Sequence, residues 1–253
     1  MKKVMTLLLF INFCFSQEKN AVTKTFFPKD SILYSSENGV SYHDESNLYG
    51  KTTLIITHKS ENGNFHFILK KKIKKLQRLI EYKNYATLEN FDFKKEKWEY
   101  SEDSKRKQNK TDIGIDTTFY SEHNLYAFVN LEEHDGFVEK CKFQDFGNIV
   151  YWPEFDYSNC IIADEDKDGF PEFYLSYMGE SDGLDAKPYK QIVYTKNSNN
   201  FNYIKSKATA YYPAGNEEDI YFVEFDTNWN NLNSKIKEKS KSLIEQHKTK
   251  YIN

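Results

Sequence analysis

The sequence predicts a mainly β fold made of antiparallel hairpins, with one α-helix near its C-terminal end. Tyr and Phe are abundant, with 19 and 20 copies against 10 Gly and 5 Pro, and large aromatic side chains favour pleated sheets. Short apolar runs recur between polar turns, which is typical of strands joined by hairpins. A stretch with helical spacing begins at Leu232.

The N-terminal stretch MKKVMTLLLFINFCFS has the pattern of a secretory signal peptide. Lys2 and Lys3 give it a positive start, and the apolar run over residues 4–15 is short for a membrane span. Cys14 and Ser16 are small residues at the two positions that a signal peptidase reads. We expect cleavage after Ser16 and export to the periplasm, the cell surface or the medium. An uncleaved anchor or a lipid on Cys14 would be the alternatives.

Composition limits the classes of function. The formal net charge is −3, so nucleic-acid binding is not expected. After removal of the signal peptide, no apolar run is long enough for a transmembrane segment. Residues 17–253 are enough for one β-rich domain. The polar segment SEDSKRKQNKTD, at residues 101–112, is the candidate linker if the domain has two subdomains.

Three hairpins are expected in chain order. The strand pairs are residues 53–57 with 65–69, residues 113–120 with 125–130, and residues 201–212 with 220–225. The first pair flanks Asn62-Gly63, a strong hairpin signal, and the others flank polar turns. The lysine-rich run at residues 70–75 is expected at a solvated hairpin end.

The C-terminal stretch Leu232–Lys250 is predicted to be helical. Leu232, Ile236, Leu243 and Ile244 fall near one face, while lysines fill most of the rest. Because this apolar stripe is thin, we expect the helix to pack on an edge of the sheet. A position on a membrane surface is disfavoured because the stripe lacks large aromatic residues.

The segment DEDKDGFPE, at residues 164–172, has the pattern of a calcium loop. Asp164, Asp166 and Asp168 stand at positions 1, 3 and 5, and Glu172 stands at position 9. Spacing by two directs alternate side chains to one side of a tight turn. Gly at position 6 allows the sharp bend that brings the Phe170 carbonyl toward the same point. Hard oxygen ligands of this kind suit Ca²⁺, whereas a metal-free solvated turn is the alternative.

The longer segment IIADEDKDGFPEFYLSY resembles the strand-loop-strand calcium loops of integrin-type FG-GAP and VCBS repeats. An EF-hand is excluded because Leu175 occupies position 12, where that loop needs Glu. FG-GAP proteins repeat the loop, whereas this chain has it once, so a propeller is not expected. The region from Phe143 to Tyr194 also resembles exported bacterial proteins that are loosely labelled surface polysaccharide biosynthesis proteins. That resemblance implies a role in the cell envelope.

Cys141 and Cys160 are the two cysteines of the chain after Ser16. Export would permit a disulfide bond between them. It would close a loop of about twenty residues and contribute roughly 3 kcal/mol. The alternative is a pair of separate buried thiols.

The expected function is binding or structural, and the partner is unknown; a glycan or an envelope protein would fit. A binding module would present an aromatic face, for which Trp152 and Trp98 are the candidates. The alternative is a carbohydrate-active hydrolase that uses carboxylates near residues 180–185, such as Glu180 and Asp185. A hydrolase requires two convergent carboxyl groups in a cleft.

Overall fold

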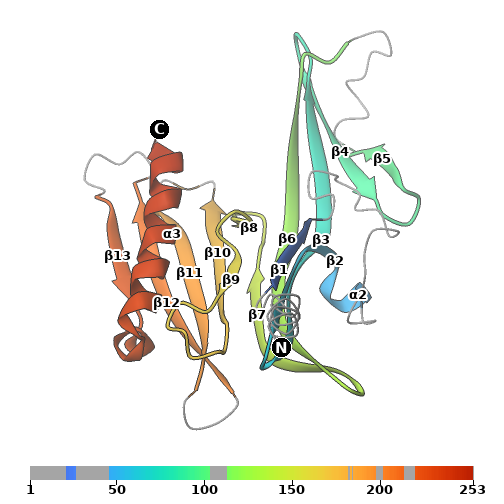
Figure 1. Ribbon diagram of the computed structural model, residues 1–253. Helices are drawn as coiled ribbons and strands as arrows, with labels where there is room; N and C mark the ends of the chain where they lie inside the picture. The colour runs from blue at the N-terminus through green and yellow to red at the C-terminus, as the bar shows by residue number, and fades with distance from the viewer. Residues whose placement is uncertain are drawn as a thin grey trace, which may run out of the picture.

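The computed structural model describes residues 21–26, 46–102, 113–181, 183, 185–197, 202–213 and 220–252. It confirms the predicted class, because two antiparallel sheets and one C-terminal helix make up most of the described chain (Figure 1). The predicted signal peptide at residues 1–16 lies outside the described residues.

The first sheet is built around one very long strand. Its members are β1 (Ala21–Phe26), β2 (Lys51–Ser60), β3 (Gly63–Glu81), β4 (Ala86–Asp92), β5 (Lys97–Tyr100), β6 (Asp116–Glu133) and β7 (Gly136–Phe146), with the short helix α2 (Ser46–Tyr49) before β2. Along one edge β3 pairs first with β2 and then with β4, while β6 pairs along its other edge. The far half of the β3–β6 ribbon therefore extends beyond β2 and β7 and carries β4 at its edge, as Figure 1 shows.

The second sheet follows in the chain. It contains β8 (Tyr151–Phe155), β9 (Ile161–Ala163), β10 (Glu172–Ser181), β11 (Lys187–Lys196), β12 (Tyr203–Tyr212) and β13 (Phe222–Phe225). A short 3₁₀ helix (Thr227–Asn231) and then α3 (Ser234–Ile252) complete the described elements. Both β8 and β9 pair with the same edge of β10.

The alternation of side chains along β10 explains how the two sheets and α3 form layers. Phe173, Leu175 and Tyr177 belong to a core shared with the first sheet, whereas Tyr174 and Met178 belong to the core beneath α3. A strand whose alternate side chains enter two cores must be apolar throughout, and β10 is buried over most of its length. The order of layers is therefore first sheet, second sheet, α3 (Figure 1).

The predicted C-terminal helix is confirmed, and so are two of the three hairpins. Leu232, Ile236, Leu243 and Ile244 are all buried against the second sheet, although the helix lies over its face at β11 and not at an edge as expected. β2 and β3 pair across the Asn62-Gly63 turn, where Gly63 has φ +125°. β12 pairs with β13, although residues 214–219 between them are not described.

The predicted hairpin between residues 113–120 and 125–130 is wrong, because residues 116–120 and 125–130 belong to the single strand β6. The polar residues between them do not turn, since each pairs with β3 across a bulge near Ile73. His123 is fully buried there, and its Nε2 lies 2.7 Å from the Pro153 carbonyl oxygen. Local polarity indicated a turn, but the backbone of these residues pairs with β3, and the His123 ring contacts Pro153, which lies 30 residues away in the sequence.

The lysine run is also not at a hairpin end, because it occupies the middle of β3. Lys70 pairs with β2 on one side and β6 on the other, and only 1% of its surface is exposed. Lys71 forms an ion pair with Glu154 of the second sheet. Lys74 Nζ donates a hydrogen bond of 2.7 Å to the Gly147 carbonyl. Their flexible stems carry the charges to acceptors at the junction of the two sheets.

The boundary between the sheets does not coincide with the candidate linker at 101–112. The strands on either side of that segment, β5 and β6, belong to the same sheet. The chain passes to the second sheet between β7 and β8 instead.

Candidate metal centre

The acidic loop at residues 164–172 closes the narrow hairpin between β9 and β10. Ala163 and Glu172 are cross-strand partners, so the loop leaves and rejoins the sheet at one point. Ile162 and Phe173, the next pair, are buried in the core shared by the sheets. The backbone turns at Lys167 (φ +63°) and Gly169 (φ +86°), and the second of these conformations suits glycine.

Four predicted ligands converge. One carboxylate oxygen from each of Asp164, Asp166, Asp168 and Glu172 lies within 4.8 Å of the others. The spacing of two residues accounts for this convergence, as the sequence pattern predicted. The Phe170 N–H donates to Asp168 Oδ1 at 2.8 Å, and coordination by the Phe170 carbonyl stays a prediction.

Backbone N–H groups orient these carboxylates. Gly169 N donates to Asp164 Oδ2 at 3.2 Å, and Asp168 N donates to Asp166 Oδ1 at 3.3 Å. Glu172 Oε2 accepts a hydrogen bond of 2.8 Å from Glu165 N. Each of these three carboxyl groups retains a second oxygen, so the loop fixes the side chains without using all of their acceptor capacity.

The electrostatics of the cluster are unfavourable without a cation. Glu172 is 3% exposed. Burial, followed by repulsion from the three aspartates and opposed by the Glu165 N–H, raises the pKa of Glu172 to about 8. Burial and the neighbouring Asp168 also raise the pKa of Asp166. Asp164 Oδ1 is buried and has no hydrogen-bond partner among the described residues. A bound cation would satisfy this oxygen and turn the repulsion into coordination.

The loop also contacts both neighbouring layers. Asn62 Nδ2, at the β2–β3 turn of the first sheet, donates a 2.5 Å hydrogen bond to the Gly169 carbonyl. Lys239 on α3 forms an ion pair of 3.5 Å with Glu165. Neither contact could be predicted from the sequence. The Asn-Gly turn was recognised as a hairpin signal, but nothing local indicated that it would touch a loop more than one hundred residues away.

Cys141 and Cys160 are free thiols in the structure, so the expected disulfide bond is not present. Cys160 is fully buried, with its Sγ 3.5 Å from both the carbonyl oxygen and the backbone nitrogen of Ser176. Burial raises the pKa of Cys160 to about 12, and it also raises that of Cys141.

The acidic region near residues 180–185 is only partly described. Glu180 lies on β10 and is half-buried, and burial raises the pKa of its carboxyl group. Lys187 Nζ donates hydrogen bonds to the carbonyls of Ser181 (2.8 Å) and Gly183 (2.6 Å). Asp182 lies outside the described residues. No pair of convergent carboxylates is therefore established here.

No family model, curated protein or solved structure matches the chain. The likeness to FG-GAP and VCBS repeats consequently rests on the loop alone. Within the described ranges, no helix is both long enough and apolar enough to span a membrane.

Proposed function

We propose that the chain is an exported, calcium-stabilised β protein with a binding or structural role in the cell envelope. In this proposal Ca²⁺ binds Asp164, Asp166, Asp168, Glu172 and the Phe170 carbonyl. The observation that carries it is the convergence of four carboxylates around one point. Hard oxygen donors in this number are what Ca²⁺ prefers, whereas Mg²⁺ demands stricter octahedral geometry.

A structural role for the ion is supported by the position of the loop. Through Asn62 it contacts the first sheet, and through Lys239 it contacts α3. An ion that fixes this loop would hold three layers in register. Export is supported by the sequence of residues 1–16, and an exported protein would meet free Ca²⁺ at levels that suit weak extracellular sites.

The direct test is calorimetric titration of Ca²⁺ into protein that has been freed of divalent ions. We expect one site with Kd of about 10⁻⁴ to 10⁻³ M, the range of extracellular modules. Mg²⁺ at the same concentration should compete poorly, because it gives up its waters reluctantly. Absence of saturable binding up to about ten times that range would refute the calcium proposal.

A carbohydrate-active hydrolase is the second candidate, and one observation favours it. Burial raises the pKa of Glu180, as a general acid in a glycosidase requires. The test compares the wild type with Glu180→Gln on a panel of chromogenic glycosides. Hydrolysis that is lost in Glu180→Gln would support this candidate, and absence of turnover by the wild type would refute it.

A further inference from the structure

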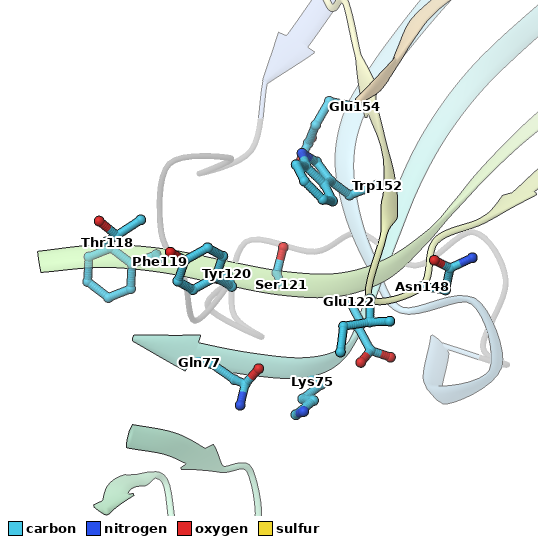
Figure 2. A pocket seen from close by; sticks show the side chains of 11 residues that line it. Lys75, Gln77, Thr118, Phe119, Tyr120, Ser121, Glu122, Asn148, Trp152 and Glu154 are labelled. Atoms are coloured by element: carbon cyan, nitrogen blue, oxygen red, sulfur yellow. The ribbon is translucent and has the colours of Figure 1, made fainter. Parts of the chain in front are cut away.

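A cavity of about 470 Å³ lies between the first sheet and the start of the second, away from the acidic loop. Its walls come from β3, β6, β8 and the segment before β8, as Figure 2 shows. This volume falls within the range of small-molecule sites, roughly 300–1,000 Å³. The cavity shares no lining residue with the candidate metal centre.

One wall carries polar side chains on adjacent strands. Lys75 on β3 is the cross-strand partner of Glu122 on β6, and Gln77 is the partner of Tyr120. The side chains of Lys75 and Glu122 have no hydrogen bond or ion pair within the part of the chain that the structure describes. Opposite charges at directly paired positions offset each other's field, and both groups remain available to a ligand.

The opposite wall holds a fixed carboxylate. Glu154 forms an ion pair with Lys71, and its Oε1 lies 3.3 Å from Nε2 of the buried His123. That Nε2 also lies 2.7 Å from the Pro153 carbonyl, so it faces two acceptors and must carry the proton. Burial lowers the pKa of His123 and keeps the ring neutral. Lys71 thus balances the charge of Glu154, whose side chain is 41% exposed.

Trp152 supplies an aromatic surface beside this carboxylate. The indole is half-buried and projects from β8 into the space above β6, as Figure 2 shows. Among the described residues, it has neither a ring contact nor a hydrogen-bond acceptor for its Nε1–H. Trp98, the other candidate from the sequence, packs instead against Arg78, with the guanidinium 4.4 Å from the ring centroid.

We propose that this cavity binds a neutral saccharide. A lysine offsets the charge of each lining carboxylate, so the cavity favours neither a cationic nor an anionic ligand. Lys75, together with Lys71 behind Glu154, disfavours a cation, and the carboxylates of Glu122 and Glu154 disfavour an anion. Hydroxyl groups can both donate to the carboxylates and accept from lysine and amide N–H groups, while the apolar face of a pyranose packs on the indole.

The test is calorimetry of the full chain with five neutral disaccharides: maltose, cellobiose, lactose, N,N′-diacetylchitobiose and xylobiose. We expect at least one to bind saturably. Trp152→Ala and the nearly isosteric Glu122→Gln should each weaken that binding at least tenfold. The matched control is Phe222→Ala, which removes an exposed aromatic ring from β13, far from the cavity lining. It should bind the same disaccharide with unchanged affinity.

Thermal melting identifies any variant that fails to fold. If Trp152→Ala fails to fold, Glu122→Gln still tests the proposal. The proposal is overturned if none of the five disaccharides binds, or if binding survives both cavity substitutions. It is also overturned if tetramethylammonium or inorganic phosphate binds in place of the sugars and is lost in the same variants. Because no residue is shared with the calcium loop, the calcium proposal would be untouched by such failure.

Discussion

Asp168→Asn should remove most of the calcium-dependent stabilisation and leave the fold intact. Asp168 is the exposed member of the acidic cluster, so its substitution disturbs packing least. Its Oδ1 accepts a hydrogen bond from Phe170 N at 2.8 Å, and an amide oxygen can accept the same bond. The substitution therefore removes one negative charge and one strong ligand, but not the local turn.

The expected size follows from binding linkage. At 10 mM Ca²⁺ and a Kd of about 10⁻⁴ to 10⁻³ M, binding stabilises the native state by about 1.4–2.7 kcal/mol. For a chain of this size, each kcal/mol raises the melting temperature by about 2–4 °C. The wild type should therefore melt about 3–11 °C higher in Ca²⁺ than in chelator. Asp168→Asn should keep less than half of that difference.

The assay is thermal melting followed by circular dichroism, with each protein in 10 mM Ca²⁺ and in chelator. Glu165→Gln is the matched control, because it removes a charge from the same loop but lies outside the convergent group. Loss of its partly exposed ion pair with Lys239 should lower the melting temperature equally in Ca²⁺ and in chelator, so the difference between the two buffers should not change. In chelator, Asp168→Asn should melt no lower than the wild type, because repulsion is relieved. Equal melting of the wild type in both buffers would refute the reasoning.

Three further outcomes are expected. Gly169→Ala should destabilise the protein by about 1–3 kcal/mol in urea unfolding, because φ is +86° and the new Cβ would lie 2.9 Å from an amide nitrogen. Gly183→Ala, which meets only ordinary contacts, should change little; an equal loss would exclude backbone strain as the cause. Leu243→Ala should cost about 2–5 kcal/mol, since the side chain is buried between α3 and the second sheet; a cost under 1 kcal/mol would mean that the helix is not docked. Cys141 and Cys160 should react slowly with a thiol reagent in native protein, because burial raises the pKa of both thiols. After denaturation without reductant both should react as free thiols. If neither reacts, the two residues form the disulfide bond after all.

The sequence was most informative where the signal is local. The Asn62-Gly63 hairpin, the apolar face of α3 and the spacing of Asp164, Asp166 and Asp168 each depend on neighbours a few residues away, and the structure contains all three features. Such patterns reflect turn geometry and side-chain periodicity, which act within one element.

Strand and turn prediction failed where polar residues contact residues that are distant in the sequence. Ser121 to Asn124 suggested a turn, but His123 contacts the Pro153 carbonyl across the sheet junction. A polar segment can continue a strand when another element supplies its hydrogen bonds, and the local sequence does not reveal that partner. The cavity beside Trp152 was missed for the same reason, since its walls come from strands that are distant in the chain.

Several charged side chains lie where layers meet, and this explains why the sequence misplaced the lysine run. Lys71 reaches Glu154, and Lys74 reaches Gly147, so the lysine run contacts the second sheet and the segment leading into it. The acidic loop contacts the first sheet through Asn62 at the other end of β2–β3. An exposed charge costs little anywhere, whereas a charge at a junction is tolerated only if the opposing layer provides its partner. These contacts therefore specify how the layers pair as well as stabilising them, and a bound cation would extend the same role to the acidic loop.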